Sequence, residues 1–189
     1  MKNIYYHGTS FDNLESILQH GISPHEPKLW NCSCDMVYAW NPASLLESEY
    51  NNDNPTYDEV HNVGVQWAFD SAQFALATAN TCRAVVIEFK ANDSDMGPDD
   101  SCENMDGAFQ TNTIRPDQIT RILVSNDLSL LKLYFIKMHI DRDLSAAEFS
   151  PEIQKIVRAI STEGIYPEDV ESITEWEEHP LPAKILKAS

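Results

Sequence analysis

The sequence predicts an α+β fold, because short β-rich runs alternate with amphipathic helical patterns. Residues 84–89 form an apolar, largely β-branched run that is typical of a buried strand. Residues 65–79 repeat small and apolar side chains at helical spacing, which predicts a helix lying close against a sheet. The length of 189 residues suits one domain, or a catalytic core with a helical appendage.

The first residues predict a strand followed at once by a helix. Residues 2–7 are rich in Ile and Tyr, as strands are. Ser10 is a good N-cap, the apolar residues after it fall on one helical face, and Gly21 is a C-terminal stop. We therefore expect Gly8 and Thr9 to lie in a tight turn between the strand and the helix.

Further strands are expected at 36–40, 108–110 and 119–124. Between them, the polar stretch 51–62 suggests an exposed insertion, and the acidic stretch 92–106, punctuated by Gly and Pro, suggests a loop.

The character of the chain changes after Ser125. Ser150-Pro151 and Pro167 are both typical of helix starts, and the second begins an acidic helical segment. The expected organisation is a core over residues 1–124 and a helical extension over residues 125–189 that packs on it.

The charge balance narrows the choice of partners. Asp and Glu number 30 against 13 Lys and Arg, which gives a net charge of −17. Such a field repels phosphate backbones, which nucleic-acid-binding proteins neutralise with basic side chains. Nucleic acid is therefore disfavoured, and a small molecule or a basic protein surface fits better, unless the acidity serves only solubility.

The cysteines predict neither disulfides nor a metal site. Cys32, Cys34, Cys82 and Cys102 are irregularly spaced, and Cys32-x-Cys34 lacks the second ligand pair of a zinc site. No apolar run approaches the roughly 20 residues that span a bilayer, and the N-terminus lacks the features of a secretory signal. We expect a cytoplasmic protein without membrane or metal.

The most specific motif is Tyr6-His7-Gly8-Thr9-Ser10, followed by Asn13-Leu14-Glu15-Ser16-Ile17-Leu18-Gln19-His20-Gly21-Ile22. It resembles the ADP-ribosyltransferase superfamily, in particular its diphtheria-toxin-like and poly(ADP-ribose) polymerase-like branch. There, a His-Gly-Ser/Thr motif on the first strand precedes a helix of the pattern Asn-Leu-x-x-Ile-Leu-x-x-Gly-Ile/Leu. The resemblance covers roughly residues 3–124. It implies two packed, mostly antiparallel sheets with NAD in the cleft between them.

The resemblance gives the motif a role in holding NAD. The backbone at Gly8 would meet the nicotinamide amide with its own N–H and C=O, provided that no Cβ intrudes. His7 would bond the ribose hydroxyls, and Thr9 would help to position the dinucleotide. In the alternative interpretation, His7 is a satisfied core histidine and Gly8 merely turns the chain.

Two tyrosines are further candidates for contact with NAD. The resemblance implies a Tyr near the start of the second strand that stacks on the nicotinamide ring, and Tyr38 occupies that position. Tyr50 is a candidate for the second Tyr that often accompanies it. Two aromatic faces around a ring contribute about 0.5–1.5 kcal/mol per pair beyond burial. A Tyr in a strand is otherwise more often part of the core.

The resemblance also implies a Glu that stabilises the oxocarbenium-like ribose as nicotinamide leaves. Aligning Ile114-Arg115-Pro116 with the family segment puts Asp106 at or next to that position. Asp is one methylene shorter, and a misplacement of about 1 Å can cost on the order of 100-fold in rate. Glu103 has a longer reach, whereas Gln110 can only hydrogen-bond. The alternative is an acidic loop without a chemical task.

The function implied is NAD-dependent mono-ADP-ribosyl transfer to a protein acceptor. Polymer synthesis is disfavoured because the family's Glu is not evident. One alternative is a catalytically silent member that binds NAD, ADP-ribose or a protein partner. Another is the RNA 2′-phosphotransferase branch, which the absence of Lys and Arg between Leu29 and Cys82 disfavours.

Overall fold

The computed structural model of the chain describes residues 3–24, 36–43, 46–47, 54–98, 107–129, 132 and 174–186. Its strands are β1 (Ile4–Ser10), β2 (Val37–Trp40), β3 (Ala84–Lys90), β4 (Gly97–Pro98), β5 (Ala108–Thr111), β6 (Ile119–Ser125) and β7 (Trp176–Glu178). Its α-helices are α1 (Leu14–His20), α3 (Tyr57–Thr78) and α7 (Ala183–Leu186), with 3-10 turns at η1 (Phe11–Asn13), η2 (Asp93–Asp95) and η4 (Pro116–Gln118). This is an α+β architecture, as the sequence predicts.

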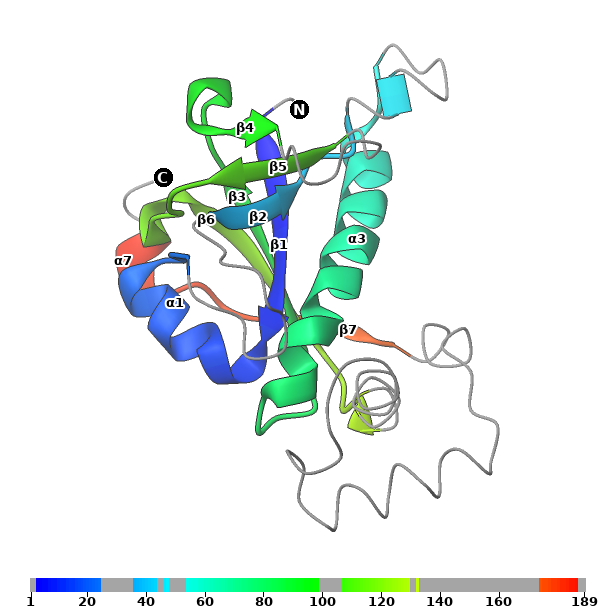
Figure 1. Cartoon of the computed structure of the whole chain (residues 1–189), viewed down its shortest axis with the longest axis vertical. Coiled ribbons are helices and arrows are strands. Elements are labelled where there is room, and N and C mark those ends of the chain that lie inside the picture. Colours follow the sequence, from blue (N-terminus) through cyan, green and yellow to red (C-terminus); the bar gives the residue numbers. More distant parts are fainter. Residues whose placement is uncertain are drawn as a thin grey trace.

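The strands form one sheet in the order β4-β5-β2-β1-β3-β6-β7, and every pairing is antiparallel. β1 and β3 pair over seven residues, but β1 and β2 share the single pair Tyr6↔Trp40. Figure 1 shows β2 and β5 running across the direction of β1. The expectation of two packed sheets is therefore wrong for the described residues, whose strands form one hydrogen-bonded sheet with a narrow junction between β1 and β2.

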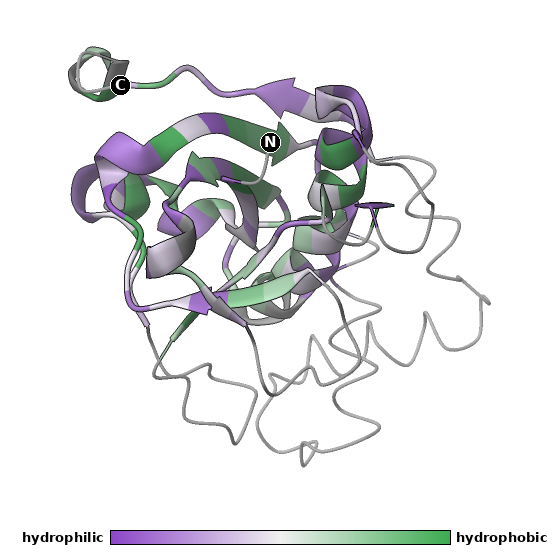
Figure 2. Ribbon diagram, turned by 90° about the horizontal axis from the view of Figure 1, so that it is seen from above, coloured by the Kyte–Doolittle hydropathy of each residue, from purple (hydrophilic) through white to green (hydrophobic). Residues whose placement is uncertain are grey.

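The sheet carries a hydrophobic core on each face, because successive side chains of a strand point to opposite faces. Tyr5 belongs to one core cluster together with Leu14 and Ile17 of α1, while Tyr6 belongs to the other, together with Ala68 and Leu76 of α3. Figure 2 shows the hydrophobic residues concentrated on the central strands and on α3. The sheet therefore lies between α1 on one face and α3 on the other.

The helix α3 begins earlier than the apolar periodicity predicts. Tyr57 is its first residue, so the second half of the stretch expected to be an exposed insertion is helical. The Thr56 side chain accepts from the Glu59 N–H, and the Glu59 carboxylate accepts from the Thr56 N–H at 2.7 Å. This reciprocal capping box satisfies two backbone donors at the helix start. The polar first turn hides the helix from a search for apolar spacing.

At the first helix, the C-terminal stop is confirmed, and Ser10 precedes η1 as its N-cap with extended backbone but without a side-chain capping bond. The tight turn expected at Gly8 and Thr9 is wrong, because both residues belong to β1 and pair with β3. Gly21 has φ 82°, a left-handed backbone that favours glycine. A Cβ there would come within 2.1 Å of the Ile114 carbonyl oxygen.

The end of the chain returns to the sheet. β7 pairs with β6, through Leu123↔Glu178 and two further pairs. The strand Trp176–Glu178 lies where the sequence suggested an acidic helix; the helix start predicted at Pro167 lies outside the described residues. In the part of the chain described, no helix is long and apolar enough to cross a membrane.

Candidate functional site

The backbone of Gly8 faces the junction between β1 and β2. In an antiparallel ladder, alternate residues of a strand direct their N–H and C=O toward the same neighbour. Phe11 N bonds Arg83 O at 3.0 Å and Ala91 N bonds Asn3 O at 3.2 Å, so the odd-numbered residues of β1 are bonded to β3. Gly8 therefore directs its N–H and C=O away from β3, toward β2.

β2 forms no ladder pair with β1 at the level of Gly8. Extending the Tyr6↔Trp40 register would pair Gly8 with Tyr38, but the recorded ladder holds only that one pair. Instead, His7 Nδ1 donates to the Tyr38 carbonyl oxygen at 2.8 Å. The side chain of one strand thus bonds the carbonyl oxygen that would otherwise face Gly8. We call this position, where Gly8 of β1 and Tyr38 of β2 face each other without forming a ladder pair, the strand gap.

Packing against α3 explains why residue 8 is a glycine, a reason that the sequence did not suggest. A Cβ built there would lie 1.7 Å from the Ala68 carbonyl oxygen and 2.8 Å from the Ala72 nitrogen. The Gly8 position therefore lets the backbone of α3 lie directly on β1. The glycine is required by this contact, whatever its edge binds in the strand gap.

The hydroxyl of Thr9 is used within the protein. Thr9 is buried, and its Oγ1 accepts from Asn13 Nδ2 at 2.9 Å. This bond ties the end of β1 to η1 and accounts for the two residues in the sequence motif. The bond to Asn13, and not a contact with a dinucleotide, therefore holds the Thr9 side chain in place.

His7 and Tyr38 meet through the Tyr38 backbone, while their side chains leave on opposite faces of the sheet. His7 alternates with Tyr6 and thus shares a face with Tyr5, whose core cluster also contains Val37 and Ala39. Tyr38 alternates with those two residues and shares the other face with Trp40. The two side chains predicted to contact NAD therefore lie on different faces of the sheet, and only the Tyr38 backbone meets His7.

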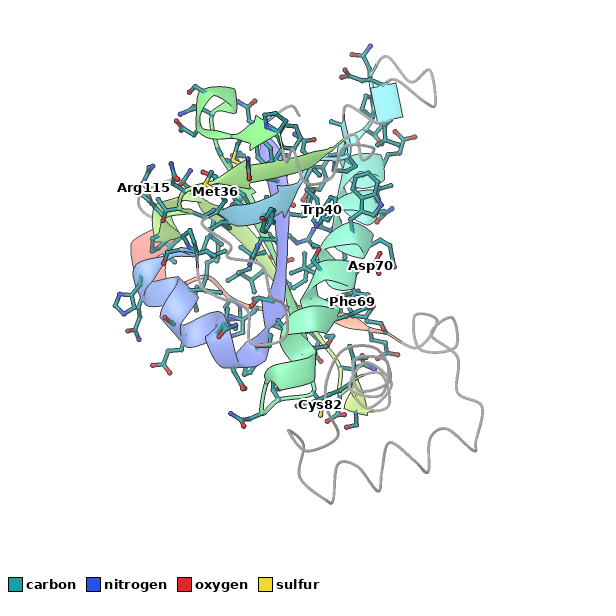
Figure 3. All side chains as sticks on the ribbon, in the orientation of Figure 1. Met36, Trp40, Phe69, Asp70, Cys82 and Arg115 are labelled. Atoms are coloured by element: carbon teal, nitrogen blue, oxygen red, sulfur yellow. The ribbon has the colours of Figure 1, made fainter. Side chains whose placement is uncertain are left out.

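The far wall of the strand gap is fixed to α3. Trp40 donates from Nε1 to Ser71 Oγ at 2.8 Å and stacks edge-on against Trp67, with ring centroids 5.6 Å apart. Figure 3 places Trp40 between β2 and α3. Because Gly8 and Trp40 both pack on α3, the helix sets the separation of the two walls.

The described residue that pairs with Tyr38 across the sheet is Gln110 of β5. β5 follows Gly107, which has φ 98° and whose carbonyl oxygen accepts from Asn41 N at 2.8 Å. The two predicted carboxylates, Asp106 and Glu103, lie outside the described residues, as does Tyr50.

A second polar cluster surrounds Glu88, which the sequence analysis did not single out. Glu88 lies on β3 and is 6% exposed. Its Oε2 accepts from Tyr57 at 2.6 Å and lies 3.2 Å from His61 Nδ1, and its Oε1 accepts from Thr120 at 2.8 Å. Tyr6 donates to it at 3.4 Å. A lone glutamate inside the apolar run 84–89 is the signal that would have identified this cluster.

The charge of Glu88 is stabilised by these donors. Burial by itself raises the pKa of a carboxyl group, but hydrogen bonds from His61, Tyr57 and Thr120 together lower the pKa of Glu88 to about 2. The neighbouring hydroxyl responds in the opposite sense, because burial and the Glu88 charge raise the pKa of Tyr6. The cluster therefore holds one ionised carboxylate among several hydrogen-bond donors.

Neither the family models nor the curated proteins searched contain a match to this chain. Among the described residues, no group of three or more His, Cys, Asp and Glu side chains is placed to hold a metal ion. The candidate functional site is therefore the strand gap, together with the His7-Gly8-Thr9 motif that borders it.

Proposed function

We propose that the strand gap binds the nicotinamide end of NAD and that the protein is an NAD-dependent mono-ADP-ribosyltransferase acting on a protein acceptor. The proposal depends on the backbone N–H and C=O of Gly8. Both groups face the strand gap, where β2 forms no ladder pair with β1. A backbone N–H and C=O side by side match the carbonyl and NH₂ of a carboxamide.

The His7–Tyr38 bond supports the proposal in two ways. It joins the His7 side chain to the Tyr38 carbonyl oxygen, at the edge of β2 that faces Gly8 without a ladder pair. It also fixes the tautomer: with Nδ1–H donating to a carbonyl, Nε2 of the neutral imidazole is an acceptor suited to a ribose hydroxyl. Tyr38 would contact the bound ring from the opposite face of the sheet.

The reaction requires a carboxylate beside the ribose. The bond from the ribose C1′ to nicotinamide breaks, and nicotinamide leaves with the electron pair. An acceptor nucleophile then bonds C1′ and releases its proton. A carboxylate hydrogen-bonded to the 2′-hydroxyl stabilises the positive charge on the ribose between these events. Asp106, directly before Gly107 and β5, is the first candidate for this group, and Glu103 is the second.

A second candidate function is NAD or ADP-ribose binding without catalysis. Gln110 is the β5 residue opposite Tyr38, and its carboxamide is neutral. An amide can hydrogen-bond a ribose hydroxyl, but it neither accepts a proton as a base nor offsets a developing positive charge. A glutamine at position 110 favours binding without catalysis if neither Asp106 nor Glu103 reaches the site.

Titration with NAD, followed by measurement of nicotinamide release, tests the proposal. We expect saturable binding, nicotinamide release, and transfer of label from NAD to a protein in a lysate. His7→Ala should abolish the labelling while leaving the melting temperature within a few degrees, because it removes one hydrogen bond worth about 0.5–1.5 kcal/mol. His20→Ala, on α1, is the matched control and should label normally.

The outcomes separate the candidate functions. Binding without nicotinamide release would support the silent form and exclude the transferase. Absence of binding in the wild-type protein would overturn both. A large loss of stability in His7→Ala would indicate a structural histidine instead of a ligand-binding one.

Asp106→Asn and Glu103→Gln decide which carboxylate is catalytic. Each change keeps the size of the side chain and removes its charge. We expect the correct one to lower nicotinamide release by about 100-fold or more while NAD still binds. If neither variant changes the rate, the assignment of the carboxylate is wrong.

A further inference from the structure

A cavity of about 460 Å³ lies between α3, β6 and the short strand β7. It is lined by His61, Asn62, Val65, Gln66, Arg121, Leu123, Trp176 and Glu178. None of these residues belongs to β1, β2 or β5, so the cavity is separate from the strand gap. Its volume falls within the range of about 300–1,000 Å³ that is typical of small-molecule sites.

The hydrogen bonds of His61 fix which of its nitrogens donates. Nε2 lies 3.3 Å from Arg121 Nη1, and a guanidinium only donates, so Nε2 accepts. Nδ1 therefore carries the proton and donates to Glu88, with the hydroxyls of Tyr6 and Tyr57 nearby at 3.4 and 3.5 Å. The buried Glu88 thus orients the His61 ring, whose Nε2 accepts from Arg121 at the cavity wall.

The cation of the cavity is already neutralised. Arg121 directs Nε and Nη2 to Glu178 Oε2 at 3.1 and 3.0 Å. An anionic ligand would compete with Glu178 for Arg121 within a chain of net charge −17, and a cationic ligand would compete with Arg121 for Glu178. A neutral ligand encounters neither obstacle.

The remaining lining combines an aromatic ring with planar polar groups. Trp176 packs edge-on against Phe69, with ring centroids 5.5 Å apart, which holds the indole in place beside Val65 and Leu123; Figure 3 labels Phe69 on α3. Asn62 and Gln66, both exposed on α3, add amides that donate and accept. The cavity therefore presents donors, acceptors and an apolar surface together.

We propose that this cavity binds a neutral, hydroxyl-rich ring, that is, a sugar. Each hydroxyl donates and accepts, so a sugar ring can bond the guanidinium N–H groups that neither Glu178 nor His61 accepts, together with both amides, without a change of charge. The apolar C–H face of the ring would lie toward Trp176. The proposal does not depend on NAD binding in the strand gap.

The test is to titrate the full chain with D-ribose, D-glucose and N-acetyl-D-glucosamine. Binding is measured by the NMR chemical shift of the Trp176 indole N–H. Inorganic phosphate and spermidine are the anionic and cationic probes. Trp176→Phe assigns the signal among the four tryptophans. We expect at least one sugar to shift it saturably at millimolar concentrations, and neither charged probe to do so.

Gln66→Ala is the informative variant, because it truncates an exposed side chain on a helix that tolerates Ala. It should weaken sugar binding about three- to tenfold, as expected for one lost hydrogen bond. Gln19→Ala, on α1, is the matched control and should bind as the wild type does. His7→Ala should also leave sugar binding unchanged, which separates this site from the strand gap. Absence of a saturable shift with any sugar, binding of phosphate instead, or an unchanged affinity in Gln66→Ala would each overturn the proposal.

Discussion

At the scale of single residues, Glu88 shows how a charge is retained inside an apolar strand. Its two oxygens accept from side chains of β1, α3 and β6, so the carboxylate links the sheet to the first turns of the helix. Hydrogen bonds to a charged group are worth about 1.5–3 kcal/mol each, more than those between neutral groups. Glu88 is therefore a structural centre and, through His61, part of the wall of the second cavity.

Glu88→Gln should destabilise the protein by about 1–3 kcal/mol at neutral pH, because the donors around it lose their charged acceptor. Urea unfolding measures the change. Glu15→Gln, exposed on α1, is the matched control and should alter the free energy of unfolding by less than about 0.5 kcal/mol.

The same variant tests the pH dependence. The pKa of Glu88 is lowered from 4.5 to about 2 in the folded protein. Its contribution to stability is therefore complete above the unfolded-state pKa and is lost as the pH falls toward 2. The difference in unfolding free energy between the wild type and Glu88→Gln should shrink over that window. A difference that stays constant as the pH falls would show that the pKa of Glu88 is not lowered in the folded state.

At the scale of elements, the contact between β1 and α3 depends on two glycines. Gly8 lies against the backbone of Ala68, and Gly64 lies against the ring of Tyr6, where a Cβ would come within 2.2 Å. The two backbones therefore meet directly at Gly8, and at Gly64 only the Tyr6 ring lies between them. This close approach places α3 beside both walls of the strand gap.

Gly8→Ala should cost at least about 3 kcal/mol, at or beyond the upper end of typical overpacking, because the atom in its way is backbone and not a flexible side chain. Gly97→Ala is the matched control, since the nearest atom to its added Cβ is 4.0 Å away, and it should change stability by less than about 1 kcal/mol. Thermal and urea unfolding measure both. Similar values for the two variants would show that α3 does not lie this close to β1.

At the scale of the whole molecule, the chain carries a net charge of −17 around one sheet. Repulsion among like charges destabilises a compact state, and dissolved salt screens it. Two exposed ion pairs, Arg121–Glu178 and Arg83–Glu177, attach β7 and oppose this trend, but surface pairs contribute only about 0–1 kcal/mol each.

The melting temperature should therefore rise as ionic strength increases from about 0.01 to 0.15 M, where the screening length falls from about 30 to about 8 Å. Differential scanning calorimetry in sodium chloride and in choline chloride should give equal shifts if screening is the cause. A melting temperature that falls with salt would mean that local attraction at pairs such as Arg121–Glu178 outweighs the overall repulsion.

Much of the element pattern is predictable from the sequence, because the strands with buried residues carry their own signals. The apolar run of β3 and the β-rich segments of β1, β2 and β6 predict strands whose ends lie within a few residues of the observed ones. The start of α3 and the strand β7 are not predictable in this way. The first turn of α3 is polar and depends on a capping box, while Trp176–Glu178 has little β-propensity and is a strand because β6 offers an unpaired edge.

The α+β class and the main strands can be predicted from the sequence, and the motif His7-Gly8-Thr9 can be recognised in it, because burial periodicity and short motifs are local properties of the chain. Only the tertiary structure decided that Gly8 serves the packing of α3, that Thr9 is bonded to Asn13, and that Glu88, His61 and Arg121 converge. These contacts join segments whose neighbours in space are set by strand order and register, and no local pattern specifies which faces will meet.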